Sequence, residues 1–305
     1  MEQRTNIKLG SGMQSKPTAM PSAIISEHLE FSTLKNRPWQ GTKRESQETV
    51  WSMLTAEERS MLEWLGQHFA KAGTSLCDLG AFVGGSTAAL ASGLRRANLG
   101  ANVKVHAFDF FEIPGNRKQR MLYRHGFPKF AGTDCLPTVR RLLHSIDDLI
   151  IYHKGDFLLQ TWNNGPIQVL HVDISKSYAL NKHILNEFFV FLQPGSSILV
   201  QQDYQHWSNP WVAASMELLE EYFELLAWTE ENAVVFGCTK AVPQGIGDIV
   251  DKELRKPGNV KALLVRAIER FPGLRQRESL AQSLLAFEAN PGIERAWQFR
   301  LPSAS

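Results

Sequence analysis

The sequence predicts an α/β fold, in which a doubly wound, mostly parallel sheet of seven strands is covered by helices on both faces and ends in an antiparallel hairpin. Between residues 75 and 200, short apolar runs alternate with helical patterns, which is typical of parallel strands joined by crossover helices. Residues 75–90 contain an apolar strand, a glycine turn and the start of a helix. Residues 223–238 contain two strand-like runs joined by a polar turn, which predicts the terminal hairpin.

The individual elements follow from the same patterns. Strands are expected at Ser75–Leu79, Val103–Phe108, Leu149–His153, Val169–Val172, Ser197–Val200, Phe223–Trp228 and Ala233–Cys238. Helices are expected at Thr87–Arg96, Leu136–His144 and Leu180–Leu192. Thr55 and Glu58 form a capping box ahead of a further helix, which should end near Gly73. Ser86 and Thr87 are typical residues for a helix start after the glycine turn.

The chain divides into a central domain at residues 55–240 and three flanking segments. Residues 1–22 are rich in Ser, Gly, Lys, Gln and Pro, which predicts a mobile tail. Residues 23–54 are expected to form an N-terminal arm, or alternatively a lid over a ligand site. Residues 241–305 return to helical periodicity, so we expect a C-terminal helical appendage.

Composition excludes several classes of protein. The chain has 305 residues, of which 43% are hydrophobic, enough for one large core. Its 33 basic and 31 acidic residues nearly balance, so neither nucleic acid nor a membrane surface is an expected partner. No apolar run approaches the roughly 20 residues of a membrane span. The three widely spaced cysteines, without a secretory signal, favour reduced core thiols in a soluble, cytoplasmic protein.

The glycine turn after the first strand predicts a cofactor site. Gly80, Gly84 and Gly85 follow the strand that carries Asp78, and Ser86 begins the next helix. A turn without Cβ atoms lets the backbone N–H groups of a helix start approach a nucleotide-like ligand. We therefore expect a nucleotide-type cofactor at the carboxyl edge of the sheet.

Each predicted parallel strand delivers an acid at or near its carboxyl end, where ligands bind in open α/β sheets. The five acids are Asp78, Asp109, Asp156, Asp173 and Asp203. Asp109, after the second strand, is placed to bind ribose hydroxyls, or else caps the following segment. Asp156 could bind an adenine amino group or merely close a turn.

This organisation resembles the class I S-adenosylmethionine-dependent methyltransferases over residues 55–240, which implies a Rossmann-like fold. The segment from Asp78 to Gly84, DLGAFVG, is similar to the family's acidic glycine loop, with Phe82 at the middle glycine position. The resemblance implies S-adenosylmethionine as the cofactor. Its implied contacts are Asp78, Gly80 and Gly84 at the amino-acid end, Asp109 at the ribose and Asp156 at the adenine. Phe82, Ser86 and Phe110 are also implied as cofactor-binding residues. The Phe82 side chain should displace the loop or lie beside the cofactor.

Two later segments resemble the bacterial macrocin-type small-molecule and sugar O-methyltransferases. They are residues 170–178, LHVDISKSY, and residues 192–204, LQPGSSILVQQDY. In that subgroup, acids after the fourth and fifth strands hold a divalent metal that lowers the pKa of the acceptor hydroxyl. The resemblance implies metal ligands at Asp173 and Asp203, with Gln202 in place of a third acid. Two carboxylates and an amide oxygen could still hold Mg²⁺.

The same segments depart from the subgroup in ways that allow a metal-free site. Lys176 stands where the subgroup has His, and Ser175 where it has Asp. Lys176 or His206 could then assist deprotonation while Asp173 orients the acceptor, with Asp203 facing it. An ion pair between Lys176 and Asp173 with a purely structural role is the alternative.

The predicted function is methyl transfer from S-adenosylmethionine to a hydroxyl of a small molecule or sugar. A non-catalytic partner protein with the same fold is one alternative, which Phe82 and Gln202 keep open. An NAD-dependent oxidoreductase is another, but the turn lacks the Gly-x-Gly-x-x-Gly order of pyrophosphate sites. The arm and the C-terminal helices are candidate elements of a homodimer.

Overall fold

The computed structural model describes residues 30–41, 50–99, 102–271 and 273–301. The predicted tail at residues 1–22 and part of the predicted arm lie outside these ranges. In the part of the chain that is described, no helix is both long and apolar enough to cross a membrane.

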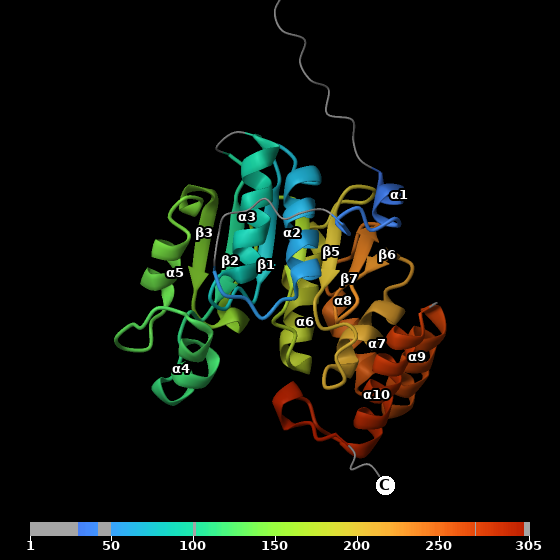
Figure 1. Cartoon of the computed structure of the whole chain (residues 1–305). Helices are drawn as coiled ribbons and strands as arrows, with labels where there is room; N and C mark the ends of the chain where they lie inside the picture. The colour runs from blue at the N-terminus through green and yellow to red at the C-terminus, as the bar shows by residue number, and fades with distance from the viewer. Residues whose placement is uncertain (1–29, 42–49, 100–101, 272, 302–305) are drawn as a thin grey trace, which may run out of the picture.

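The seven predicted strands form one sheet in the order β3-β2-β1-β4-β5-β7-β6 (Figure 1). The first five are parallel, and β7 runs antiparallel between β5 and β6, so the predicted fold class is confirmed. The strands are β1 (Ser75–Leu79), β2 (Val105–Asp109), β3 (Ile150–Lys154), β4 (Ile167–Val172), β5 (Ile198–Gln201), β6 (Phe223–Trp228) and β7 (Val234–Cys238).

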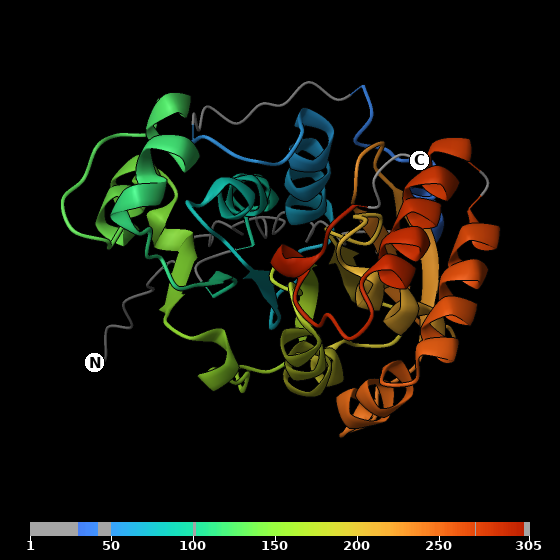
Figure 2. The same cartoon turned by 90° about the horizontal axis from the view of Figure 1, so that it is seen from below.

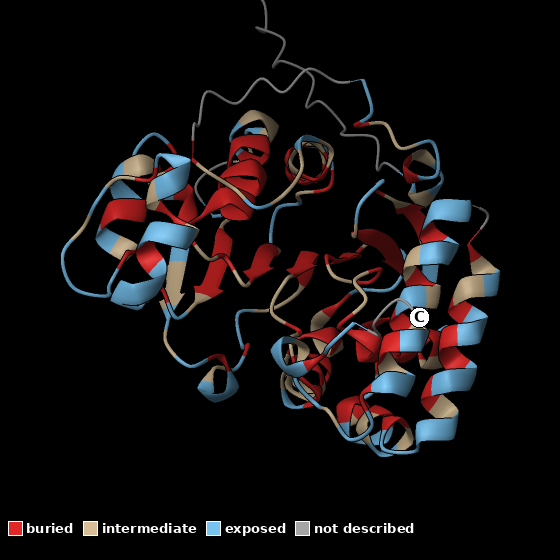
Figure 3. Cartoon of the chain, turned by 60° about the horizontal axis from the view of Figure 1, so that its bottom comes forward, coloured by how far each residue is buried: buried red, intermediate tan, exposed pale blue. Residues whose placement is uncertain are grey.

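Helices cover both faces of the sheet because alternate strand residues are buried on opposite sides. In β1, Leu76 packs into the core beneath α2 (Ala56–His68), α3 (Gly85–Ala97) and α5 (Leu136–Leu142). Its neighbours Cys77 and Leu79 pack into the other core, beneath α6 (Tyr178–Glu187), α7 (Pro210–Leu218) and α8 (Ile246–Leu254). The central strands are therefore buried on both sides, as Figure 3 shows. All three cysteines are buried free thiols, as expected.

The segments before and after the central domain pack against it. The short helix α1 (Phe31–Leu34) lies beside β6, and the Phe31 ring fills the space that a side chain at Gly237 would need. Helix α4 (Gly115–Met121) lies in the long connection after β2. The C-terminal helices α9 (Pro257–Arg270) and α10 (Leu274–Ala289) pack against α7 and each other, with their outer faces exposed (Figure 3).

After α10 the chain turns back to the carboxyl edge of the sheet (Figure 2). Arg295 forms an isolated bridge with Ser177, and the Ala296 N–H donates to the Lys176 carbonyl at 2.9 Å. We call residues 294–298 the C-terminal strap. The strap contains the short 3-10 turn Ala296–Gln298. The predicted possibility of a homodimer stays a prediction.

Two details of the glycine turn and its neighbours differ from the prediction. The N-cap of α3 is Gly84 in a left-handed conformation, and no side chain caps this helix. Ser86 and Thr87 lie in the first turn of α3, where they were expected, and their hydroxyls donate to Asp78 rather than capping the helix. Helix α2 ends at His68, before the expected Gly73.

Candidate functional site

Three adjoining cavities follow the carboxyl edge of the sheet. The loop cavity, of about 200 Å³, lies between residues 51–54 and the glycine turn. The Phe110 cavity, of about 420 Å³, contains Phe110, Asp156 and part of the strap. The Lys176 cavity, of about 570 Å³, contains Asp173, Lys176, Asp203 and His206. Met53, Leu54, Asp173 and Lys176 line both the loop cavity and the Lys176 cavity, so these two spaces meet there.

The glycine turn requires its glycines for both conformation and space. Gly80 has φ +98°, and a Cβ there would lie 2.9 Å from the carbonyl carbon and oxygen of Asp173. Gly84 has φ +91°, and a Cβ there would lie 3.0 Å from Val139. The close approach of Gly80 to Asp173 brings the loop cavity next to this acid, which follows β4 directly.

Phe82 adopts the left-handed backbone conformation expected of the glycine that the methyltransferase resemblance places at this position. Its φ is +49°, a left-handed conformation that costs a non-glycine residue about 1–2 kcal/mol. The Phe82 N–H donates to Asp109 Oδ2 at 2.9 Å, which stabilises this conformation. The ring packs edge-to-face against Trp51 with centroids 5.9 Å apart, and it lines the loop cavity. Phe82 therefore lies beside the space that the turn encloses.

Asp109, at the end of β2, lies between the loop cavity and the Phe110 cavity. Its carboxylate accepts N–H groups from Phe82 and Phe111, both at 2.9 Å. Burial raises the pKa of Asp109, although these two hydrogen bonds lower it. A carboxylate offers about four acceptor positions, so Asp109 can accept further hydrogen bonds from a ligand.

Asp78 does not line a cavity. It is fully buried within β1, where its Oδ2 accepts hydrogen bonds from Ser86 Oγ at 2.8 Å and Thr87 Oγ1 at 2.5 Å. Its Oδ1 lies 2.8 Å from His171 Nδ1. Asp78 therefore fixes the glycine turn from behind, because both of its oxygens are occupied by groups of the protein. Ser86, in contrast, lines the loop cavity as well as holding Asp78.

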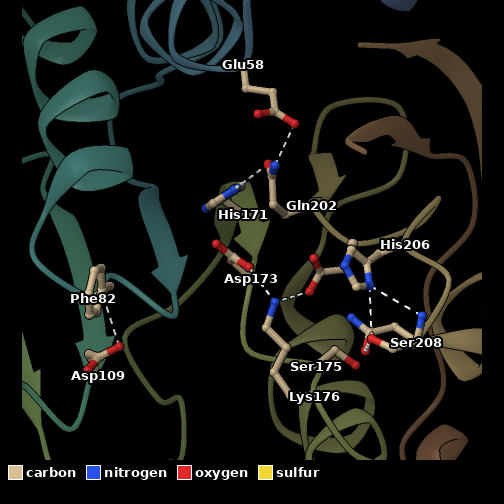
Figure 4. A network of polar contacts seen from close by, with 12 residues as sticks. Glu58, Phe82, Asp109, His171, Asp173, Ser175, Lys176, Gln202, His206 and Ser208 are labelled. Atoms are coloured by element: carbon tan, nitrogen blue, oxygen red, sulfur yellow. Dashed lines mark hydrogen bonds and ion pairs between the residues drawn. The ribbon is translucent and has the colours of Figure 1, made fainter. Parts of the chain in front are cut away.

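A buried polar chain connects Asp78 with the start of α2 through His171, Gln202 and Glu58. Figure 4 shows these last three residues. Gln202 donates its amide N–H to Glu58 at 2.6 Å, so its oxygen faces His171 Nε2, 3.3 Å away. Glu58 in turn accepts from the backbone N–H of Thr55 at 2.8 Å, in the predicted capping box. Both ring nitrogens of His171 thus face acceptors, which requires an imidazolium. Burial opposes that charge, but Asp78 outweighs it and raises the pKa of His171.

The Lys176 ammonium connects the acids that follow β4 and β5 (Figure 4). Lys176 Nζ lies 2.8 Å from Asp173 Oδ1 and also pairs with Asp203. Burial raises the pKa of Asp173 to about 6, although Lys176 lowers it. Burial lowers the pKa of Lys176, but the two carboxylates outweigh it and raise that pKa above the ordinary lysine value. An ammonium held in this way has no lone pair, so Lys176 is not the base considered from the sequence.

The donor set does not fit the magnesium site that the resemblance implies. Lys176 Nζ lies between the two carboxylates that would be the main ligands. The Gln202 oxygen, the expected third ligand, faces His171 instead. Among the described residues, no group of three or more His, Cys, Asp or Glu side chains could hold a metal ion. We therefore derive no catalytic step from a metal.

His206 also lines the Lys176 cavity, but its ring acts as a donor. The backbone N–H and the hydroxyl of Ser208 lie 3.3 and 2.9 Å from His206 Nδ1. Burial lowers the pKa of His206, with Asp203 opposing this shift. The neutral ring accepts the Ser208 N–H at Nδ1 and therefore carries its proton on Nε2. His206 can thus donate a hydrogen bond into the cavity, but in this tautomer it is not a general base.

The remaining predicted residues divide between the Phe110 cavity and the core. Phe110 is half exposed, and Asp156 is exposed beside it, where it accepts the Leu158 N–H at 3.0 Å. Ser175 points away from the site and donates to Asn181, while its carbonyl accepts from Trp211.

Sequence reasoning missed four residues of the site. Glu58 carried a helix-capping signal but no sign of its contact with Gln202. His171 was expected only to be packed and hydrogen-bonded. Trp51 and Trp297 line the cavities from the two ends of the chain, and nothing local in the sequence marks them.

Comparisons with known proteins agree with this fold. Residues 77–204 match a family model described as "Methyltransferase domain". None of the curated protein sequences searched matches the chain.

Among solved structures, one similar chain is CalS11, a TDP-rhamnose 3'-O-methyltransferase of calicheamicin biosynthesis. It has 13% identity and a TM-score of 0.45, and the match covers 68% of this chain and 92% of CalS11. CalO1, a calicheamicin methyltransferase in its SAH-bound form, has 14% identity and a TM-score of 0.32 over 60% and 54%. The aTrm5 chain of a complex with tRNALeu has 11% identity and a TM-score of 0.31 over 63% and 46%. Likenesses this low carry no information about the acceptor. Residues 77–204 thus match a methyltransferase domain in sequence, and they contain most of β1 and the whole of β2 to β5, the parallel strands of the sheet.

Proposed function

We propose that the protein transfers a methyl group from S-adenosylmethionine to a hydroxyl group of a small molecule or sugar. The observation that carries this proposal is the meeting of two spaces at Asp173 and Lys176. One space is enclosed by a glycine turn suited to a nucleotide-type cofactor. The other is larger and combines polar with apolar side chains, and it suits a separate acceptor molecule.

The cofactor follows the carboxyl edge of the sheet in this proposal. The backbone from Gly80 to Gly84 surrounds the amino-acid end, with Phe82 beside it and Asp78 fixing the turn from behind. Asp109 accepts hydrogen bonds from the ribose hydroxyls, since it faces both cavities. The adenine occupies the Phe110 cavity, against the exposed part of Phe110 and close to Asp156.

The acceptor occupies the Lys176 cavity. The walls of this cavity combine hydrogen-bonding side chains with apolar ones, among them the indole of Trp297. Such a wall suits a neutral molecule with several hydroxyl groups, because amides and carboxylates pair with hydroxyls and an aromatic ring covers a sugar face. The three buried thiols fit a reducing compartment such as the cytoplasm.

Alignment and proton removal are the two tasks left to the protein, because the sulfonium cofactor carries its own leaving group. Asp173 lies where the two cavities meet, so the acceptor hydroxyl beside it faces the methyl group. With a pKa of about 6, Asp173 is mainly ionised at neutral pH and can accept the hydroxyl proton. Asp203 and the Nε2–H of His206 hold the acceptor from the far side.

Substitution of the two acids at opposite ends of this path tests the division of the site. We expect Asp109→Ala to weaken S-adenosylhomocysteine binding by tenfold or more, about the effect of losing a charged hydrogen-bond partner. Asp203→Ala should leave that affinity unchanged and abolish methyl transfer in a screen of sugar and phenolic acceptors. Titration calorimetry measures the first effect, with Asp248→Ala, an exposed acid on α8, as the control. Equal loss of cofactor affinity in both variants would show that the division is wrong.

A further inference from the structure

We propose that Lys176 takes the place of a divalent metal ion in this active site, so that methyl transfer depends on a cation that belongs to the chain itself. This inference rests on the proposed function for its catalytic meaning. The structural part of the inference is that the Lys176 ammonium prevents Asp173 and Asp203 from binding a metal ion. This part can be tested separately.

The Lys176 ammonium occupies the position that a metal ion would take. Asp173 and Asp203 follow neighbouring parallel strands, β4 and β5, and two carboxylates so placed repel each other unless a cation lies between them. Lys176 Nζ fills that position, at 2.8 Å from Asp173 and in contact with Asp203. Nζ supplies the charge that a metal ion would supply, at half the magnitude.

The Lys176 backbone is held on both sides. Its N–H donates to the Ile174 carbonyl at 2.6 Å, and its carbonyl accepts the Ala296 N–H of the C-terminal strap at 2.9 Å. The side chain therefore starts from a fixed point. Displacing the ammonium would require the side chain alone to swing away from two carboxylates.

Two further oxygen groups near the pair are already occupied by other partners. Gln202 points its oxygen to His171, and Ser175 donates to Asn181 within the core. A divalent cation between Asp173 and Asp203 would therefore lack both of these oxygens, and it would meet the Lys176 charge at short range.

Lys176 differs from a purely structural ion pair because it is accessible. Its side chain is 36% exposed and lines both the loop cavity and the Lys176 cavity. An ammonium has three N–H donors, and two of them meet Asp173 and Asp203. The third can meet the acceptor oxygen at the junction of the cavities.

The chemical step balances without a metal. The acceptor hydroxyl gives its proton to the Asp173 carboxylate, and an oxygen lone pair forms the bond to the methyl carbon. The carbon–sulfur bond breaks with its electron pair on sulfur, which leaves a neutral thioether. Lys176 keeps all its protons and stabilises the oxygen as negative charge develops on it.

Binding of Mn²⁺ measured by electron paramagnetic resonance tests the inference without a known acceptor. We expect the wild-type protein to bind Mn²⁺ only weakly, and Lys176→Ala to bind it about tenfold tighter or more because two carboxylates are left facing each other. The double variant Lys176→Ala/Asp203→Asn should lose this gain. Lys182→Ala is the matched control, since Lys182 pairs with Asp248 at a similar side-chain exposure of 39% and lines none of the three cavities.

Two results would overturn the inference. One is wild-type Mn²⁺ binding as tight as that of Lys176→Ala, and the other is a gain that survives in the double variant. Lys176→Gln is the second variant if Lys176→Ala does not fold. Titration of each variant with S-adenosylhomocysteine keeps the two proposals apart, because cofactor binding reports on the proposed function and Mn²⁺ binding on the role of Lys176.

Discussion

At the scale of single residues, His171 is the centre of the buried polar chain behind the site. It is fully buried, and its two nitrogens face the Asp78 carboxylate and the Gln202 oxygen. Replacing it would leave Asp78 as a buried charge held only by two hydroxyl groups. Removal of one partner from a buried charged pair is among the most destabilising of substitutions.

We therefore expect His171→Leu to lower the free energy of unfolding by about 3 kcal/mol at pH 6. The effect should shrink as the pH rises. The pKa of His171 is raised in the folded state, so its stabilisation is complete below the unfolded value of 6.5 and is lost as the pH rises through the folded value. Urea unfolding of both proteins at about pH 6 and pH 9 measures this difference.

His106 provides a control of opposite sign. Burial, with His153 beside it, lowers the pKa of His106 to about 4. The contribution of His106 to the free energy of unfolding is therefore present above pH 6.5 and is lost as the pH falls towards 4. A His106→Leu variant should approach the wild-type stability at low pH, whereas His171→Leu should approach it at high pH. The same pH trend in both variants would contradict the assignment of His171 as an imidazolium.

From the sequence, the positions of the acids along the sheet edge could be predicted more reliably than the directions in which their side chains point. Asp109, Asp156, Asp173 and Asp203 line the cavities because residues that follow parallel strands meet at one edge of a sheet. Asp78 precedes the end of β1 and is buried behind the turn. The direction of a side chain depends on neighbours that are remote in sequence, and here those neighbours include His171.

At the scale of elements, the contact between α2 and α3 supports the glycine turn from outside. The two helices approach closely at Gly66 and Gly93. A Cβ at Gly93 would lie 2.0 Å from the Glu63 carbonyl oxygen and 2.8 Å from the Gln67 nitrogen, both backbone atoms. Neither can move without shifting α2.

We expect Gly93→Ala to destabilise the protein by about 3 kcal/mol, because the helices must separate to admit the methyl group. Gly258→Ala in the first turn of α9 is the matched control. Nothing lies within 4 Å of a Cβ at Gly258, so this substitution should be neutral or stabilising by up to about 1 kcal/mol. Equal unfolding midpoints in urea for the two variants would contradict this account of the α2–α3 contact.

Element types were predictable from periodicity, but some boundaries were not. The terminal strand β6 matches its prediction at both ends. The helix expected to reach Leu192 ends at Glu187 and gives way to a short 3-10 turn, Phe189–Phe191. Ser86 and Thr87 lie in the first turn of α3, as expected, but their hydroxyls bind Asp78, a partner that local propensity does not reveal.

At the scale of the whole molecule, the site is closed by segments from both ends of the chain. Trp51 to Leu54 lie over the glycine turn, and Ser52 occupies the space that a Cβ at Gly85 would need. The C-terminal strap lines the Lys176 and Phe110 cavities (Figure 2). Helix α1 instead packs beside β6, and Trp39 contacts Glu57 and Trp64 of α2, so the residues before the central domain meet several separate parts of it. Such contacts between distant segments leave no periodic signal in the sequence.

The central claim is that the carboxyl edge binds S-adenosylmethionine rather than another nucleotide. Calorimetric titration of the full chain with S-adenosylhomocysteine, and separately with NAD, tests this claim most directly. We predict one site per chain with a dissociation constant on the order of micromolar for S-adenosylhomocysteine, and no measurable heat with NAD. Binding of NAD, or no binding of S-adenosylhomocysteine to the folded protein, would contradict the account.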